Sequence, residues 1–154
     1  MINSMTTYYA GSEAERRALD GYIKLSRASE AVSTAINGYL KEYDLTISQF
    51  GVLEAIYHLG PLHQKHLAQK ILKSDGNLTL VIDNLVKQAL VERVRDIVDR
   101  RCVYVHLTTR GRELISTLFP AHVQRVLTTM NILTPEEQDQ LAVLCRKLGL
   151  GVGL

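Results

Sequence analysis

The chain has few cysteines and no long apolar run. Its two cysteines, Cys102 and Cys145, lie far apart and have no Cys-x-x-Cys spacing, so neither a disulfide scaffold nor a structural zinc finger is expected. No apolar stretch reaches roughly 18 residues, the length that a membrane-spanning helix needs. No basic segment followed by an apolar one opens the sequence, so no secretory leader is expected. These absences predict a cytoplasmic protein without a membrane partner.

The motifs of common enzymes are also missing. The sequence contains no glycine-rich phosphate loop, no His-Glu-x-x-His motif and no nucleophile elbow. Internal repeats and low-complexity segments are absent as well. Hydrophobic residues make up 46% and charged residues 22% of the 154 residues, which is typical of one globular domain. We therefore expect neither an enzyme nor a bound cofactor.

Positive charge is concentrated in one third of the chain. Residues 61–112 hold ten Lys or Arg and five Asp or Glu, whereas the remainder holds eight and eleven, which gives net charges of +5 and −3. A local excess of basic residues is the electrostatic requirement for contact with phosphates. This division favours a nucleic-acid partner for the basic segment.

The basic segment contains a helix followed directly by a hairpin. Within residues 73–90, apolar side chains recur with the spacing of one buried helical face: Leu78, Val81, Ile82, Leu85, Val86, Ala89 and Leu90. From Val103 to Leu107, apolar and other residues alternate, as in a half-buried strand. A polar helix face beside an arginine-rich hairpin suits a major groove and the adjacent minor groove of double-stranded DNA.

Further helices are predicted on both sides of this segment. Capping-box pairs open helices at Ser12 and Thr46, and Thr108 and Thr134 are good N-caps for two more. The helices are expected over residues 12–43, 46–59, 63–72, 110–130 and 134–149. We predict a mainly α fold with a small antiparallel β hairpin, namely a winged helix-turn-helix flanked by dimerisation helices. The expected divisions are 12–44 (N-terminal dimerisation helix), 45–108 (DNA-binding domain) and 109–150 (C-terminal dimerisation helices).

Three motifs resemble those of the MarR (multiple antibiotic resistance regulator) family of bacterial transcription factors. They are Leu-Val-Lys-Gln-Ala-Leu-Val-Glu-Arg at 85–93, Asp-Arg-Arg at 99–101 and Val-Tyr-Val-His-Leu-Thr-Thr-Arg-Gly at 103–111. The resemblance implies a homodimeric regulator, in most cases a repressor, that binds a pseudo-palindromic operator. One departure is Ala89, which stands where the family usually has glycine. Because alanine resists a left-handed conformation, we expect the helix to run on by a residue or to close differently.

The candidate DNA contacts fall on the helix and the hairpin. On the helix, short or flexible polar side chains and one apolar contact for thymine methyl groups are predicted to meet the major groove: Ser74, Asn77, Thr79, Leu80, Asn84 and Lys87. Asp83 is expected to pair with Lys87 four residues later. In the hairpin, the resemblance implies that Asp99 orients Arg101 into the minor groove, and Arg95 and Arg100 are expected to contact phosphates. A solvated helix face, or a winged helix that binds protein and not DNA, is the alternative.

Three mechanisms could regulate DNA binding: a small ligand, a redox-sensitive thiol or a metal ion. Family members commonly release DNA when a small aromatic compound binds beside the dimerisation helices, and the residues predicted to line such a pocket are Tyr39, Tyr43, Phe50, Tyr57 and His58. Alternatively, Cys102 between the wing arginines acts as a redox-sensitive thiol. His58, His63 and His66 cluster in the sequence, but no carboxylate or cysteine nearby completes a metal site, so no metal is expected.

Overall fold

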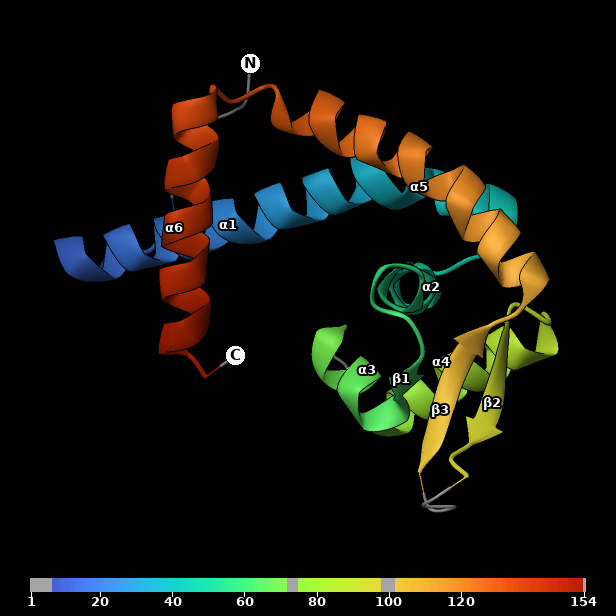
Figure 1. The fold of residues 1–154 in the computed structure, drawn as a ribbon. Coiled ribbons are helices and arrows are strands. Elements are labelled where there is room, and N and C mark those ends of the chain that lie inside the picture. Colours follow the sequence, from blue (N-terminus) through green and yellow to red (C-terminus); the bar gives the residue numbers. More distant parts are fainter. Residues whose placement is uncertain (1–6, 72–74, 98–101, 154) are drawn as a thin grey trace. The chain divides into compact units, whose positions relative to one another are not determined.

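The computed structural model describes residues 7–71, 75–97 and 102–153. For residues 75 and 76 it describes the backbone alone. It divides into two units, Met1–Gly38 and Tyr39–Leu154, which are described separately. In chain order the elements are α1 (Glu13–Asn37), η1 (Gly38–Tyr43), α2 (Ile47–Leu59), β1 (Leu62–His63), α3 (Gln64–Lys70), α4 (Asp75–Lys87), β2 (Val91–Arg95), β3 (Val103–Leu107), α5 (Thr109–Met130) and α6 (Pro135–Gly151) (Figure 1).

The first unit is the helix α1. The predicted capping box is present, because the Ser12 hydroxyl accepts from the Glu15 backbone and the Glu15 carboxylate accepts from the Ser12 backbone. The continuous α-helix predicted to reach Tyr43 instead changes into the 3-10 turn η1 at Gly38. Glycine has a low helix propensity, which accounts for the change at this position. Ile36 is the buried residue of α1, whereas the side chains of Leu19 and Tyr22 are exposed.

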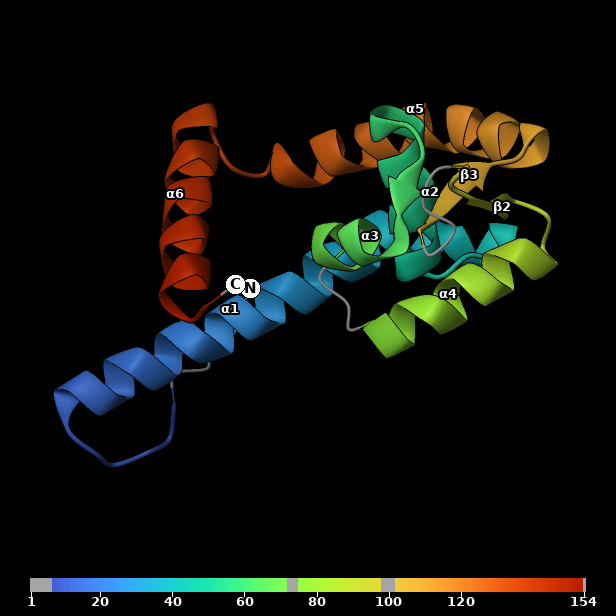
Figure 2. The ribbon, with the colours of Figure 1, turned by 60° about the horizontal axis from the view of Figure 1, so that its bottom comes forward.

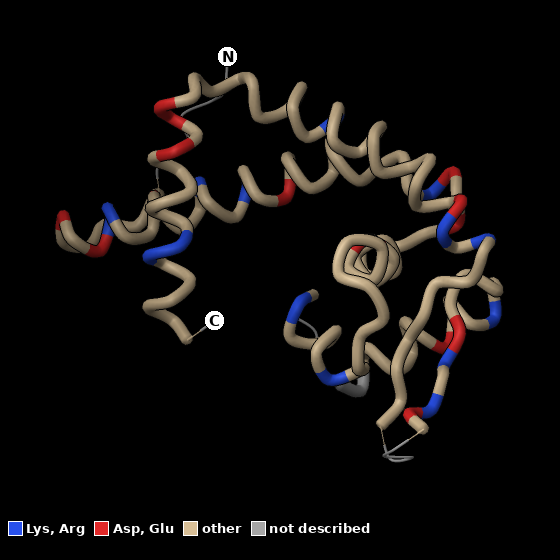
Figure 3. The backbone as a smooth tube through the Cα atoms, in the orientation of Figure 1, with Lys and Arg blue, Asp and Glu red and all other residues tan. Residues whose placement is uncertain are grey.

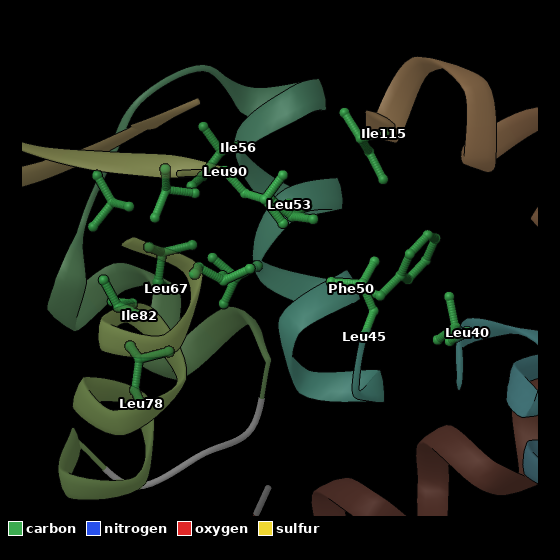
Figure 4. Packing of buried hydrophobic residues seen from close by; sticks show 14 of the residues in the cluster. Leu40, Leu45, Phe50, Leu53, Ile56, Leu67, Leu78, Ile82, Leu90 and Ile115 are labelled. Carbon is green, nitrogen blue, oxygen red and sulfur yellow. The ribbon is translucent and has the colours of Figure 1, made fainter. Parts of the chain in front are cut away.

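The second unit is built around one apolar core. Helix α2 contributes Phe50, Leu53 and Ile56, and side chains from η1, α3, α4, the sheet and α5 pack around them (Figure 4). The predicted apolar stripe of α4 supplies Leu78, Ile82 and Leu85, all with no measurable exposure. Val86, which was predicted on this buried face, is exposed, because it lies at the edge of the stripe.

The predicted hairpin is present and is joined by a third strand. The strand order is β1-β3-β2, and all pairs are antiparallel. Val105, at the centre of β3, lies opposite Arg93 of β2 and Leu62 of β1, and its side chain is buried. The third strand, β1, consists of two residues and overlaps the start of the helix predicted over 63–72. It was not predicted, because so short a strand shows no alternation in the sequence.

The end of α4 corrects the expectation for Ala89. This residue has φ +55°, the left-handed conformation that alanine was expected to avoid. The Leu90 amide donates to the Leu85 carbonyl and the Ala89 amide to the Val86 carbonyl, which closes the helix. The Thr108 hydroxyl donates to the Ala89 carbonyl at 2.7 Å. The two local hydrogen bonds and the tertiary one from Thr108 hold the strained residue in place.

The start of α5 packs directly on this closed turn. Thr108 caps α5 by accepting from the Gly111 amide, and its own amide donates to the Leu90 carbonyl. A side chain at Gly111 would place its Cβ 1.9 Å from the Leu90 carbonyl oxygen, which no packing can accommodate. Glycine at 111 is therefore required by the close approach of α5 to the chain that links α4 to the wing.

Helix α6 differs from the helices of the core. Its predicted N-cap, Thr134, forms a capping box with Glu137, and Pro135 occupies the first turn. None of its described residues is buried, and Val143 and Leu144 are 66% and 64% exposed. Within the described residues, no helix combines the length and the apolar character needed to cross a membrane.

Candidate nucleic-acid interface

Helix α4 presents an exposed face opposite its buried stripe. Asn77, Thr79 and Lys87 are exposed, and Asn84 is half-buried. Leu80 is 61% exposed, which is unusual for leucine on a helix that also supplies core residues. The face therefore combines donors, acceptors and one apolar side chain. Ser74, the remaining predicted residue of this helix, lies outside the described residues.

Helix α3 contributes a side chain to the same surface. The two helices lie side by side (Figure 2), and the Gln64 amide donates to the Thr79 hydroxyl oxygen at 2.7 Å. Gln64 was not among the predicted site residues. Its partner lies 15 positions away in the sequence, so no local pattern indicates the contact.

Asp83 of α4 forms an ion pair with an arginine of the hairpin. Its carboxylate lies 2.7 Å from a guanidinium nitrogen of Arg93 on β2, so the predicted pairing with Lys87 is wrong. Arg93 sits on the neighbouring strand, and the pair links α4 to the sheet. Both side chains are partly exposed, at 32% and 42%, so the contribution of this ion pair to stability is small. Its effect on the site is electrostatic, because a bare carboxylate would repel phosphates.

Basic residues also lie on the elements that come before and after α4 in the chain. Figure 3 shows Lys and Arg positions on α3, on β2 and at the start of α5. They include Lys65 and Lys70 of α3, Arg93 and Arg95 of β2, and Arg110 and Arg112 of α5. The predicted wing residue Arg95 is exposed near the end of β2. The other predicted wing residues, Asp99, Arg100 and Arg101, lie outside the described residues.

The predicted pocket residues form part of a ring cluster centred on α5. Tyr39 and Phe50 are buried, and the Phe50 ring centroid lies 4.5 Å from that of His122. The Tyr39 hydroxyl lies 3.3 Å from Nδ1 of His122, at hydrogen-bonding distance. The guanidinium of Arg125 lies 4.5 Å from the Tyr39 ring centroid. The sequence did not point to His122 and Arg125, because they lie more than 80 residues from Tyr39.

The same cluster extends toward the end of α2. His58 is exposed and packs edge-on against Phe119 at a centroid distance of 4.5 Å, and Tyr57 contacts His58. Burial lowers the pKa of His122, and the positive charge of Arg125 lowers it further, whereas Glu54 opposes the shift. Burial also raises the pKa of the Tyr39 hydroxyl, an effect that Arg125 offsets in part. Both shifts favour the neutral forms of the two side chains.

A cavity of about 550 Å³ opens elsewhere on this unit, between the end of α4 and the first half of α5. Of the five predicted pocket residues, only Tyr43 lines it. The other lining residues are Asp44, Gln88, Leu90, Arg110, Glu113, Leu114 and Thr117. The predicted pocket residues are therefore divided between this cavity and the packed ring cluster.

The cysteines and histidines that could serve redox or metal control lie apart from one another, except for His63 and His66. Cys102 is half-buried directly before β3, and Cys145 is exposed on α6. The His63 and His66 ring centroids lie 5.9 Å apart, while His58 packs against rings of α2 and α5. Across residues 7–71, 75–97 and 102–153, no three His, Cys, Asp or Glu side chains are grouped to hold a metal ion. A thiol switch at Cys102 stays a prediction.

Helices α2, α3 and α4 and the three-stranded sheet together define a winged helix-turn-helix protein. A family model described as "Transcriptional regulator SarA/Rot" matches residues 34–118. The HTH-type transcriptional regulator YkoM of Bacillus subtilis is 36% identical over 138 residues, which cover 90% of each chain.

Solved structures agree with this classification. A mutant MarR of E. coli in complex with operator DNA has a TM-score of 0.75 and 26% identity, and the match covers 90% of this chain and 99% of that one. BpsR of Bordetella bronchiseptica, whose DNA binding is regulated by 6-hydroxynicotinic acid, has a TM-score of 0.73 and 28% identity over 83% of this chain and 96% of its own. The chain belongs to the MarR family of winged-helix transcriptional regulators, and the SarA/Rot model covers more than half of it. It is a DNA-binding transcriptional regulator and not an enzyme.

Proposed function

We propose that the protein is a cytoplasmic repressor that binds a pseudo-palindromic operator as a homodimer and reads bases with α4. The observation that carries this proposal is the exposed face of α4, where Leu80 stands among polar side chains on a helix otherwise anchored in the core. Asn77, Thr79 and Asn84 would hydrogen-bond base edges, and Leu80 would contact thymine methyl groups. Lys87 would contact phosphates or base edges, and so would Ser74, whose assignment rests on the sequence.

The wing has a separate role in this proposal. Arg101 would enter the minor groove, oriented by Asp99, because a guanidinium is favoured by the negative potential of a narrow groove. Arg95, exposed on β2, and Arg100 would contact phosphates. The wing assignment for Asp99, Arg100 and Arg101 rests on the sequence motif.

Dimerisation would use the helices on either side of the winged helix, residues 12–44 and 109–150. Helices α1 and α6 expose apolar side chains, among them Tyr22, Leu144 and Leu148. A second copy of the chain that covers these side chains would remove apolar surface from water. Two-fold symmetry would then place two α4 helices about one DNA turn apart, which explains the expected palindrome.

The proposed effector is a small aromatic or phenolic compound, and the charge of Arg125 favours one that carries a carboxylate. The half-buried rings of Phe119 and His122 offer aromatic surface, and the exposed guanidinium of Arg125 on the same helix can pair with a carboxylate. The regulation of BpsR by 6-hydroxynicotinic acid supports this class of ligand. The expected effect is release of DNA, which Arg125→Ala would weaken without reducing binding of the unliganded protein to DNA.

The test of the proposed function starts from a randomised duplex pool. Duplexes retained by the protein should share two inverted half-sites, and footprinting should protect both. Affinity should fall steeply as salt rises, because phosphate contacts release counterions. Arg101→Ala should lose most of the specific affinity at fixed salt while the thermal transition stays unchanged. Retained duplexes without a shared sequence, or affinity that does not respond to salt, would contradict the proposal.

A further inference from the structure

Gln64 and Thr79 form a side-chain contact whose two ends are both fixed by the fold. Gln64 is the first residue of α3, and it directly follows β1, which pairs with β3 through Leu62 and His63. Leu67, one turn later in α3, has no exposure. Thr79 follows Leu78, which is equally buried, in α4. The backbones at both positions are therefore held by core packing, and the 2.7 Å hydrogen bond between the side chains joins two anchored points.

The hydrogen bond also has a direction. The Gln64 amide nitrogen donates, and the Thr79 oxygen accepts. In a helix, threonine divides between two χ1 rotamers, since its hydroxyl can also turn toward the preceding helical turn. A donor fixed on α3 favours the rotamer in which the Thr79 oxygen faces α3, and so it also sets the direction of the Thr79 methyl group. The net strength of one hydrogen bond corresponds to a roughly two- to tenfold rotamer preference.

For a residue that reads DNA, this choice of rotamer changes the chemistry that a base edge meets. A hydroxyl accepts from or donates to adenine, guanine or cytosine edges, whereas a methyl group fits against the thymine methyl. The two groups sit on the same carbon, so turning χ1 from one rotamer to the other can bring the methyl group to the place that the hydroxyl held. Fixing χ1 in advance also removes the entropy cost of ordering the side chain when DNA binds.

We propose that Gln64 is a positioning residue that holds the Thr79 side chain in one rotamer and thereby determines which bases α4 prefers. The inference rests on the proposed function in one respect, that Thr79 lies at the DNA surface. Beyond the proposed function, it assigns to Gln64 of α3 an influence on the base specificity of α4. The role is distinct from folding: the contact lies at the exposed surface, where a single hydrogen bond adds little to the stability of the folded state.

The test compares base preferences among four variants of the full-length protein. Gln64→Met keeps the length and the helix propensity of the side chain but cannot donate, and Thr79→Val replaces the hydroxyl with a methyl group of similar size. The double variant combines them, and Gln69→Met, at an exposed position of the same helix, is the matched control. Each protein selects duplexes from a randomised pool, and affinities for the selected duplex and its single-base variants are measured at fixed salt. Thermal transitions establish that each variant is folded.

The expected result is that Gln64→Met lowers discrimination roughly two- to tenfold at the base pairs whose preference Thr79→Val also changes. Gln69→Met should keep the wild-type preferences, and the double variant should match Thr79→Val alone, because Gln64 acts through Thr79. The positioning role is overturned if Gln64→Met keeps wild-type preferences, or if its effect persists in the Thr79→Val background, as direct contact of Gln64 with DNA would require. Unchanged preferences in Thr79→Val itself would instead refute the assignment of Thr79 as a reader, and the role of Gln64 with it.

Discussion

The winged-helix body and the two flanking helices α1 and α6 bury their apolar residues to very different extents. In the body, side chains from α2, α3, α4, α5 and the sheet meet in one cluster, and several of them have no exposure at all. Helix α1 buries Ile36, and α6 buries none of its described residues, although both helices carry leucines and other apolar side chains. The body can therefore be stabilised by its own core, whereas the flanking helices leave apolar side chains exposed, which the second chain of the proposed dimer would cover.

The largest effect expected within the body is that of Gly111→Ala. Because a Cβ at this position would lie 1.9 Å from the Leu90 carbonyl oxygen, either α5 or the turn after α4 must move. We expect a loss of about 3 kcal/mol or more in the free energy of unfolding, measured by chemical denaturation. Gly21→Ala in α1, where a Cβ meets nothing within 4 Å, is the control and should not destabilise the protein. Equal effects at the two glycines would refute the close approach.

The flanking helices should respond to a change that leaves the body intact. Leu144→Asp places a charge on the exposed apolar side of α6 and should raise the dimer dissociation constant at least tenfold, about 1.4 kcal/mol. Sedimentation at several protein concentrations measures this shift, and Ala142→Asp, at an exposed position on the opposite side of the same helix, is the control. A tightly dimeric Leu144→Asp protein would remove α6 from the proposed dimer interface.

A smaller effect of opposite sign is expected at the end of α4. Ala89 has φ +55°, which glycine adopts without strain, so Ala89→Gly should stabilise the protein by about 1 kcal/mol. Ala142→Gly in the interior of α6 should instead be destabilising by roughly 0.5 to 1 kcal/mol, because glycine is a poor helix former. Thermal and chemical denaturation of both variants checks the signs. Destabilisation by Ala89→Gly would show that the left-handed turn is not strained.

The smallest expected effect is a pH dependence from His122. Burial lowers the pKa of His122 in the folded protein, so the unfolded chain binds its proton more readily. Its contribution to stability is therefore complete above the ordinary histidine pKa of about 6.5 and is lost as the pH falls through the lowered value. His122→Gln should reduce the drop in Tm between neutral and mildly acidic pH, whereas His66→Gln on the exposed side of α3 should not. The same drop in His122→Gln as in the wild type would contradict this origin.

The elements that could be predicted from the sequence are those encoded by neighbouring residues. The capping boxes at Ser12, Thr46 and Thr134 and the apolar stripe of α4 are local patterns, and the helices that they predict are present. The exposed face of α4 follows from the same period, so the exposure of Leu80 was predictable.

What the sequence did not reveal depends on contacts between distant segments. The pairs Gln64–Thr79 and Tyr39–His122 join residues 15 and 83 positions apart, and such separations leave no periodic signal. At Ala89 the local preference was misleading, because hydrogen bonds from Leu90 and Thr108 hold a conformation that alanine alone disfavours. At Asp83 the i+4 rule named Lys87, but β2 brings Arg93 to the carboxylate.

The most direct test of the account compares the affinity for a duplex with two inverted half-sites and the affinity for a duplex with one. The wild-type protein should bind the two-half-site duplex on the order of a hundredfold more tightly or better, because the paired body binds both half-sites at once. Leu144→Asp, at concentrations where it is monomeric, should bind the duplex with one half-site as the wild type does. Its affinity for the duplex with two half-sites should no longer be higher. A wild-type protein that binds both duplexes equally, or a monomeric variant that retains the advantage, would contradict the division between a DNA-reading body and pairing helices.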